Sequence, residues 1–413
     1  MTPLAEVRLD IENLCRTHQG AGRASLGRLL GGMVEVDSSG AWVHTHDGRR
    51  FLNFGGHGVY LLGHRHPAVT AAVRQQLETH PMSTRVFFEP VGIEAAAELA
   101  SVTPPGLDLV HFVNSGAEAT EAALKLARAH GKNQLVTTHR GFHGKTLGAL
   151  SVTARRLYQD PFEPLLPGVT VVPYGDPVAL EAALAAVAGR GCFIVEPVQG
   201  EGGVIVPPPD YLATATQLCR RYDSLLIVDE IQTGLGRLGS WWGVDTAGVV
   251  PDLLLVGKVL SGGVVPVSAV VTTADIYKPF AKDPYLHSST FAASPIACSA
   301  ALAAVRVVRD EDIVSRAATI GEELLDAVRG VMSHVETERV EVRGRGLLIG
   351  IEFDEPGLVG ELYLNLVDRG VLVNHSLNSP TVLRLTPPAI LSPAELEFFN
   401  TVFAEAVAET VAK

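Results

Sequence analysis

The sequence predicts an α/β protein in which a large domain, built on a mainly parallel β-sheet, is joined to a smaller domain. The chain has 413 residues, more than one hydrophobic core usually supports. Short, continuously apolar segments alternate with Ala-rich segments, a pattern typical of parallel strands that helices cover on both faces. After about Leu302 the pattern changes to long helices with few strands. These three observations predict two domains of different construction.

Each element of the large domain is predicted by its own segment. The run Ser224–Asp229 is apolar almost throughout, as expected of a strand in the middle of a buried sheet. The same pattern predicts further strands at Leu109–Val113, Gln134–Thr138, Val169–Pro173, Cys192–Glu196 and Asp252–Val256. The segments around them predict helices at Pro67–Thr79, Val91–Ala100, Ala117–His130, Val178–Ala188 and Asp210–Tyr222. We assign residues 51–305 to the large domain, and residues 1–50 with 306–413, ending in a helix near Ser392–Val411, to a small α+β domain.

Composition argues against several classes of protein. The formal net charge is −12 and no run of Lys and Arg is present to contact phosphates, so nucleic acid is not an expected partner. No apolar segment is long enough to span a membrane, and the N-terminal region lacks the apolar core of a secretory signal. The four cysteines are widely spaced and form no metal-binding pattern. We therefore expect a cytoplasmic protein with neither a metal site nor a membrane partner.

The first candidate site follows the predicted strand that ends at Val113. The residues Asn114-Ser-Gly-Ala-Glu-Ala-Thr120 lead into an Ala-rich helix, and ligands of open α/β sheets lie at the carboxyl ends of the strands. The free N–H groups at the start of this helix, together with the Ser115 hydroxyl, are suited to bind an anion. The alternative interpretation is an ordinary capping box formed by Ser115 and Glu118.

The second candidate is Asp229, which ends a very apolar strand and begins the segment Asp229-Glu-Ile-Gln-Thr-Gly-Leu-Gly-Arg237. A carboxylate in such surroundings is costly unless another group pairs with it. A protonated pyridine nitrogen is one such partner. The alternative interpretation is that Asp229 caps a following helix.

The third candidate is Lys258, which lies between an apolar strand and the Gly-rich segment Ser261-Gly-Gly263. A lysine in a partly dry site has a lowered pKa and can act as a nucleophile or a base. Its separation from Asp229 allows one helix-containing crossover between neighbouring strand ends. The alternative interpretation is a lysine in a surface loop.

Together these motifs resemble those of the class III aminotransferases of pyridoxal-phosphate (PLP) fold type I. This group contains the ornithine, acetylornithine, 4-aminobutyrate and putrescine aminotransferases. The resemblance extends from about Gly32 to Pro388, and six stretches carry it jointly: Asn114-Ser-Gly-Ala-Glu-Ala, Glu196-Pro-Val-Gln-Gly-Glu-Gly-Gly, the Asp229 segment, Gly257-Lys258, His287-Ser-Ser-Thr-Phe and Arg343-Gly-Arg-Gly. It implies an aspartate-aminotransferase-like fold with a seven-stranded sheet, PLP as the cofactor, and amino-group exchange between a small amine and a 2-oxo acid.

The resemblance also implies a role for each residue of the cofactor site. Lys258 bonds to the cofactor and later moves a proton between substrate and cofactor, while Asp229 keeps the ring nitrogen protonated. The phosphate is implied to contact Ser115, Gly116, Ala117 and Thr290. Phe142 and Ile231 are implied to cover the two ring faces, and Gln232 to bond the phenolic oxygen. His143 and Glu196 are expected nearby, with Glu196 orienting Gln232. Thr290 is contributed by the other subunit, which implies a homodimer with shared sites. Core packing is the alternative for Phe142, and helix capping is the alternative for Thr290.

Three further residues concern the substrate. Arg384 matches the family arginine that binds an α-carboxylate through its two-pronged guanidinium group, although a lone arginine here also suits an exposed edge strand. Glu201 matches the glutamate that pairs with this arginine when the incoming amine has no carboxylate at that point. Tyr60 is expected near the entrance, where a packing role is the alternative.

Lys145 distinguishes between substrates. Ornithine and acetylornithine enzymes commonly have arginine at this position, whereas putrescine aminotransferases commonly have lysine. The stretches 161–168, 202–211 and 370–378 also resemble the putrescine type. A lysine cannot bind a second carboxylate with two parallel bonds. We therefore hypothesise a terminal amine donor, with putrescine or cadaverine leading, and 2-oxoglutarate as acceptor.

One segment departs from the family pattern. Ala292, Ala293 and Ser294 stand where glycine, glycine and asparagine are common, so we expect reshaped access to the site. The alternatives are therefore a transaminase of a larger aldehyde or ketone, an ornithine-, acetylornithine- or lysine-type transaminase, and a PLP-dependent aminomutase or decarboxylase. A binding module without activity is disfavoured because both Lys258 and Asp229 are present.

Overall fold

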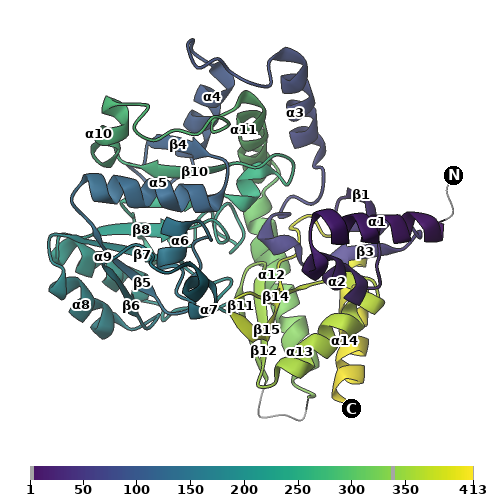
Figure 1. Cartoon of the computed structure of the whole chain (residues 1–413). Helices are drawn as coiled ribbons and strands as arrows, with labels where there is room; N and C mark the ends of the chain where they lie inside the picture. The colour runs from purple at the N-terminus through teal and green to yellow at the C-terminus, as the bar shows by residue number, and fades with distance from the viewer. Residues whose placement is uncertain (1–3, 336–339, 413) are drawn as a thin grey trace.

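The centre of the protein is a seven-stranded sheet. The computed structural model describes residues 4–335 and 340–412, and the strand order is β4-β10-β9-β8-β7-β5-β6 (Figure 1). Neighbouring strands are parallel except at β10, which is antiparallel to both β4 and β9. The predicted mainly parallel, seven-stranded sheet is confirmed. Its strands are β4 (Leu109–Val113), β5 (Gln134–Thr138), β6 (Val169–Val172), β7 (Gly191–Val195), β8 (Leu225–Asp229), β9 (Leu253–Val256) and β10 (Ser268–Thr272).

Helices cover both faces of this sheet, which explains why its strands are apolar without alternation. In β8, Leu225 and Ile227 pack into the cluster that contains α5 (Gly116–Ala129), while Leu226 and Val228 pack into the cluster that contains α9 (Tyr211–Arg221). The other helices of this part are α3 (Pro67–Thr79), α4 (Pro90–Ala100), α6 (Leu147–Val152), α7 (Arg156–Gln159), α8 (Pro177–Ala186), α10 (Ala274–Lys282) and α11 (Pro295–Asp310). The predicted helices and strands agree with these bounds to within one or two residues.

The strand β10 is the strand of this sheet that the sequence pattern did not predict. It follows the Gly-rich segment after Lys258 without an intervening α-helix, and it runs back against its neighbours. All five of its residues are buried. A strand reached by a loop instead of a helix breaks the strand–helix alternation on which the prediction rested.

The remaining elements form two smaller sheets, in the orders β1-β2-β3-β13 and β11-β12-β15-β14. The first joins distant parts of the chain, because β13 pairs in parallel with β3. The division into residues 51–305 and 1–50 with 306–413 stays a prediction. The bounds are β1 (Glu35–Ser39), β2 (Trp42–Thr45), β3 (Arg50–Asn53), β11 (Val340–Arg345), β12 (Leu348–Phe353), β13 (Val371–Leu372), β14 (Asn374–Ser376), β15 (Ser379–Leu385), α1 (Leu4–His18), α2 (Ala21–Leu29), α12 (Ile313–Met332), α13 (Pro356–Asp368) and α14 (Pro393–Val411).

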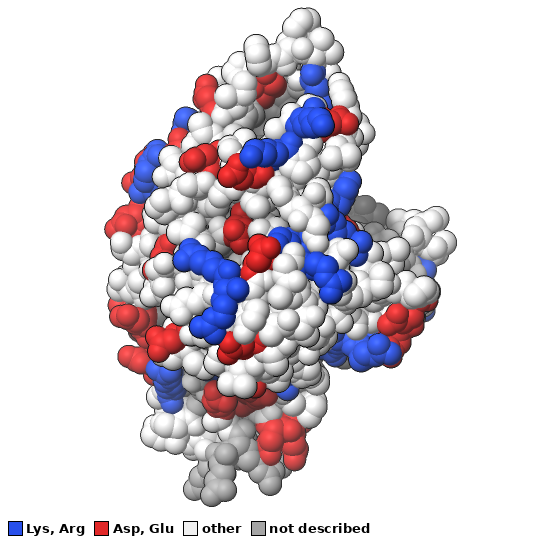
Figure 2. Space-filling model, turned by 90° about the vertical axis from the view of Figure 1, so that its left-hand side faces the viewer, with Lys and Arg blue, Asp and Glu red and all other residues white. Residues whose placement is uncertain are grey.

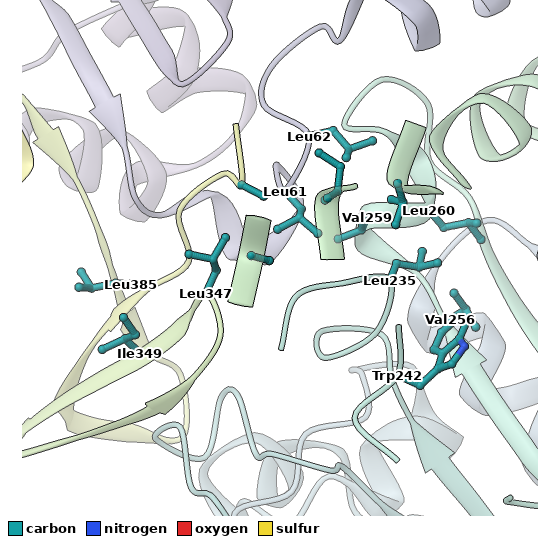
Figure 3. Packing of buried hydrophobic residues seen from close by; sticks show 14 of the residues in the cluster. Leu61, Leu62, Leu235, Trp242, Val256, Val259, Leu260, Leu347, Ile349 and Leu385 are labelled. Carbon is teal, nitrogen blue, oxygen red and sulfur yellow. The ribbon is translucent and has the colours of Figure 1, made fainter. Parts of the chain in front are cut away.

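A continuous hydrophobic cluster joins the large sheet to the smaller ones. In Figure 3, Leu61 lies between Leu347 and Leu235, although the three residues come from widely separated segments. All three are fully or almost fully buried members of one cluster, which also contains Val256 of β9 and Leu385 of β15. The loop that follows Asp229 is therefore packed firmly against the sheet that carries Arg384.

The surface carries charges of both signs. Acidic and basic side chains are interspersed over the face shown in Figure 2. Among the residues that the structure describes, no helix is long and apolar enough to cross a membrane.

Candidate active site

A cavity of about 220 Å³ lies at the carboxyl ends of the central parallel strands. Asp229 ends β8, while Glu196 and Lys258 follow β7 and β9 closely. The carboxyl ends of parallel strands meet at one edge of a sheet, so residues far apart in sequence converge there. The cavity is lined by Gly116, Ala117, Phe142, His143, Gly144, Glu196, Glu201, Asp229, Ile231, Gln232 and Lys258.

Asp229 is enclosed and has partners on both oxygens. Its Oδ2 lies 2.7 Å from Nδ1 of His143, and its Oδ1 accepts a hydrogen bond from the Ile231 N–H (3.1 Å). The residues after it form turns and not a helix. The interpretation of Asp229 as a helix cap is therefore wrong, and the carboxylate is oriented by the protein toward the cavity wall.

Lys258 adopts a left-handed backbone conformation, with φ of 43°, at the start of the short 3-10 helix η4 (Lys258–Ser261). Non-glycine residues rarely adopt this conformation, and where they do the position is often functional. Burial lowers the pKa of Lys258 to about 8, although the nearby carboxylates, Glu201 first among them, oppose the shift. The interpretation of Lys258 as an ordinary surface lysine is therefore wrong.

Glu196 joins two loops at the edge of the cavity. Its Oε1 accepts from the Phe142 N–H (3.0 Å) and its Oε2 accepts from the Gly200 N–H (3.1 Å). Burial raises the pKa of this carboxyl to about 7. Among the described residues no hydrogen bond joins Glu196 to Gln232, so Glu196 does not orient Gln232 directly as the sequence led us to expect.

Gln232 instead contacts a buried ion pair. Arg384 Nη1 lies 2.7 Å from Glu201 Oε1, and both side chains are almost inaccessible to solvent. Gln232 Nε2 donates to that same Glu201 oxygen, and Gln232 Oε1 accepts from Arg384 Nη1, both at 3.4 Å. The Leu377 N–H donates to the other Glu201 oxygen (2.9 Å). Burial opposes ionisation of Glu201, but the charges of Arg384 and Lys258 hold its pKa at about 2.

Arg384 therefore lies in the protein interior and not on an exposed strand. Its strand β15 is flanked by β12 and β14, so it is not at a sheet edge. Nε and Nη2 of its guanidinium group are buried and have no hydrogen-bond partner among the described residues. Arg384 thus retains donors for a further acceptor.

The start of α5 forms one wall of the cavity. Ser115 accepts a hydrogen bond from the Glu118 N–H (3.3 Å), while Glu118 reaches back to the N–H of Asn114 (2.6 Å) and not to that of Ser115. The predicted capping box is thus only half formed. A Cβ at Gly116 would lie 2.8 Å from Cδ1 of Ile231, so a larger residue here would displace the Ile231 side chain. Ser115 lines an adjoining cavity of about 310 Å³ that shares Gly116 and Lys258 with the first.

Five predicted residues do not line the first cavity: Ser115 lines the adjoining one, Arg384 contacts Glu201, and the other three are Thr290, Lys145 and Tyr60. Thr290 is exposed, and its carbonyl accepts from the Arg85 guanidinium (3.0 Å). Lys145 is also exposed, with its ammonium nitrogen 4.0 Å from the ring centroid of Tyr158. Tyr60 lines neither cavity; it stacks on His64, with ring centroids 3.9 Å apart, which is the packing role.

Two neighbouring residues were not assigned roles from the sequence. Burial lowers the pKa of His57, and its ring also interacts electrostatically with Glu201, Arg384 and Lys258. Arg237 is completely buried and donates to backbone carbonyls. The sequence shows that each lies in a glycine-containing loop, which is a signal of a functional position. It does not show which residues lie next to them in space.

Comparison with known proteins identifies the family. The model of the family "Aminotransferase class-III" matches residues 31–407. The chain belongs to the class III aminotransferases. It is similar to the ornithine aminotransferase of Toxoplasma gondii, with 35% identity over 92% of this chain and 91% of that chain and a TM-score of 0.86. It is also similar to a thermostable (S)-enantioselective ω-transaminase of Thermomicrobium roseum, with 28% identity over 98% and 99% of the two chains and a TM-score of 0.90.

This class III aminotransferase is a PLP-dependent enzyme, and the cavity fits its cofactor. Three groups face the same cavity. They are Lys258, whose pKa is lowered, the oriented carboxylate of Asp229, and the N-terminus of α5 at Gly116, which has no Cβ. These groups match the aldehyde, the ring nitrogen and the phosphate of PLP in chemical character.

Proposed function

We propose that this aminotransferase moves a terminal amino group from a diamine or another ω-amino donor, with putrescine leading, to 2-oxoglutarate. The observation that carries the proposal is the buried pair of Arg384 and Glu201 beside Lys258. While the pair is closed, Glu201 neutralises Arg384, which suits a donor without a carboxylate at this point. When Arg384 turns from Glu201, its two unpartnered nitrogens offer a fork for the carboxylate of a 2-oxo acid.

Lys258 is proposed to transfer the protons. When bound, PLP supplies an electron-withdrawing ring that acidifies the amino-bearing carbon of the substrate. Lys258 Nζ then takes a proton from that carbon and returns it during the exchange. Because burial lowers its pKa to about 8, part of the amine is neutral, and therefore basic, near neutral pH.

The other cavity residues are proposed to hold and orient the cofactor. Asp229 faces the ring nitrogen, with His143 and Glu196 supporting it and the neighbouring loops. Phe142 and Ile231 cover the two ring faces, and Gln232 reaches the phenolic oxygen. The phosphate is assigned to Ser115, Gly116 and Ala117 at the start of α5, where helix N–H groups favour an anion.

Lys145 bears on the identity of the amine donor. Its ammonium nitrogen lies over the rings of Tyr158 and Phe142, 4.0 Å and 5.9 Å from their centroids. Held there, Lys145 presents a point charge and not a fork, so it recognises a second carboxylate less specifically than arginine would. This supports a donor that lacks a carboxylate at this point. It argues against ornithine, the amino acid that names the similar enzyme of Toxoplasma gondii.

A second candidate function is favoured by the adjoining cavity. Beside Lys258, Val59, Val264, Val265 and Pro266 present an apolar wall to this space of about 310 Å³. Apolar walls suit the hydrocarbon part of a larger aldehyde or ketone. Such a carbonyl compound would replace the small amine and keep glutamate as the amino donor.

We also propose a homodimer in which Thr290 of each subunit completes the phosphate site of the other. Phe87, Phe88 and Phe291 are 80%, 96% and 63% exposed, and exposed aromatic side chains in one region mark an interface. Sharing of sites is tested by mixing inactive Lys258→Ala subunits with Thr290→Ala subunits. If sites are shared, each mixed dimer contains one intact site and activity returns; no recovery would contradict shared sites.

The experiment that tests the function follows the visible spectrum of the purified enzyme as single amines are added. The panel is putrescine, cadaverine, ornithine, acetylornithine, lysine and glutamate, with Lys258→Ala as the control. We expect glutamate and a diamine each to bleach the cofactor band. Bleaching by glutamate alone would favour the larger carbonyl substrate, and turnover of acetylornithine without any response to diamines would reject the proposed donor.

A further inference from the structure

Arg237 is a fully buried cation without a carboxylate partner. Its side chain is inaccessible to solvent, and across the described ranges no Asp or Glu oxygen forms an ion pair with it. Nη1 donates to the carbonyls of Leu347 (3.1 Å) and Pro387 (2.6 Å), and Nη2 donates to that of Gly58 (3.4 Å). Burying a guanidinium group without a counter-ion is costly, so the position calls for a functional explanation.

Two of these carbonyls adjoin residues of the site, and the third adjoins a strand that pairs with β15. Pro387 lies just beyond Arg384 at the end of β15. Gly58 follows His57, whose ring interacts electrostatically with Glu201 and Arg384.

The carbonyl of Leu347 and the loop that carries Arg237 link the strand β15 to the cofactor side of the cavity. Leu347 precedes β12, which pairs directly with β15 and places Gly350 opposite Arg384. The loop that carries Arg237 begins after Asp229 and also carries Gln232. Arg237 therefore connects the cofactor side of the cavity to the strand that holds Arg384.

The backbone around Arg237 leaves little room for movement. The Leu347 N–H donates to the Arg237 carbonyl (2.9 Å), so the two residues are bonded in both directions. At Gly346, which has φ of 53°, a Cβ would lie 2.4 Å from the Leu238 carbonyl carbon. The turn and the loop are in close contact, and the side chain of Arg237 extends that contact to Pro387 and Gly58.

The charge of Arg237 also acts on the site. Burial, with a contribution from the charge of Arg384, lowers the pKa of Arg237 to about 9, which leaves the guanidinium group protonated at neutral pH. Arg384 is paired with Glu201, and Arg237 has no anion of its own. A second positive charge behind Arg384 favours an incoming anion.

We propose that Arg237 is a positioning residue for the carboxylate of the 2-oxo acid. It fixes Arg384 relative to Gln232 through three carbonyls and adds a positive charge behind Arg384. The inference rests on the proposed function, in which Arg384 binds that carboxylate.

The test measures binding of glutarate to the holoenzyme by calorimetry. Glutarate has both carboxylates of 2-oxoglutarate but no carbonyl to react, so its Kd reports binding alone. Arg237→Met removes the charge and all three bonds, whereas Arg237→Lys keeps the charge but cannot span the three carbonyls. Arg384→Met is the reference for loss of the carboxylate site.

Arg316→Met is the matched control. Arg316 also donates to backbone carbonyls, those of Ala389 (3.0 Å) and Leu391 (3.4 Å), but it lines neither cavity at the site. We expect Arg237→Met to weaken glutarate binding about tenfold or more and Arg237→Lys to weaken it less. Arg316→Met should lower the melting temperature without changing Kd.

The outcomes separate the inference from the function on which it rests. If either folded Arg237 variant binds glutarate as tightly as wild type while Arg384→Met does not, the inference is overturned and the function stands. If Arg384→Met binds like wild type, or wild type binds no glutarate, the carboxylate site itself is rejected. Should Arg237→Met fail to fold, the Arg237→Lys comparison decides.

Discussion

His143 Nδ1 lies 2.7 Å from Asp229 Oδ2, and both side chains are almost wholly enclosed by protein. The Ile231 N–H occupies the other oxygen of Asp229, so the orientation of the carboxylate is fixed from two sides. Nε2 of His143 is buried and has no hydrogen-bond partner within the described part of the chain. The imidazole is therefore held chiefly through Asp229, and in the proposed function it supports the carboxylate that faces the cofactor ring.

Replacing His143 with phenylalanine is expected to weaken cofactor binding. The variant retains a ring but loses a hydrogen bond to a buried carboxylate, which we expect to raise the Kd for PLP about tenfold. The measurement is a titration of the apoenzyme with PLP, followed by protein fluorescence. His139→Phe, an exposed position in the same loop, is the control and should bind PLP normally. Equal affinities for the two variants would argue against a supporting role for His143.

Replacing Glu201 with glutamine is expected to favour the 2-oxo acid. In the wild type the Glu201 carboxylate neutralises Arg384 and repels an incoming carboxylate, and the variant removes that negative charge at nearly constant shape. We expect the KM for 2-oxoglutarate to fall about tenfold. Glu352→Gln, which breaks the Arg343–Glu352 pair outside the site, is the control. An unchanged or higher KM in Glu201→Gln would count against a switching pair.

Glu230 is expected to make stability depend on pH. Burial raises the pKa of this carboxyl from 4.5 to about 7, so the folded state keeps a proton that the unfolded state loses at lower pH. Its contribution to stability is therefore full below pH 4.5 and declines as pH rises toward 7. A shift of this size corresponds to about 3 kcal/mol.

The Glu230→Gln variant isolates this effect, because it cannot titrate. Relative to wild type, its free energy of unfolding should be higher, meaning that the variant is more stable, at pH 8 than at pH 5. Urea unfolding at both pH values gives the comparison, with the partly exposed Glu181→Gln, which breaks a surface pair with Arg221, as control. If the difference in free energy of unfolding between wild type and variant does not change with pH, Glu230 titrates normally.

Ala293 is expected to be a strained position. Its φ is 56°, in the left-handed region that glycine adopts without cost, and the family commonly has glycine in this segment. Ala293→Gly should therefore stabilise the protein by about 1 kcal/mol. Ala292 is buried and is not left-handed, so Ala292→Gly should instead destabilise it. The two melting temperatures give the test, and a loss of stability in both variants would refute the strain.

Much of the fold was predictable because it is determined locally. Uninterrupted apolar runs such as that of β8 can only be buried on both faces, and Ala-rich segments between them supply the covering helices. The position of Asp229 at the end of that strand, and of Lys258 after the next, also followed from sequence. Strand ends of a parallel sheet share one edge, so a common site for both residues was foreseeable.

The hydrogen-bond partners of individual site residues were not predictable, because they depend on how separate loops pack against one another. Glu196 was expected to orient Gln232, but its oxygens accept hydrogen bonds from the backbone N–H groups of Phe142 and Gly200. Gln232 contacts the Arg384–Glu201 pair instead. Competition among neighbouring donors for a carboxylate depends on distances of a few tenths of an ångström, which sequence spacing does not specify.

The sequence by itself thus determined the class of fold, the family, and the lysine and aspartate at the strand ends, because hydrophobic pattern and local motif are properties of contiguous residues. Tertiary structure alone decided that β10 runs antiparallel, that His143 orients Asp229, and that the expected pair of Arg384 and Glu201 is buried and contacts Gln232. It also decided that Arg237 has three carbonyls and no carboxylate for its partners. Each of these depends on how distant loops pack over the edge of the sheet, where the free energy of burial favours whichever polar partners lie within hydrogen-bonding distance.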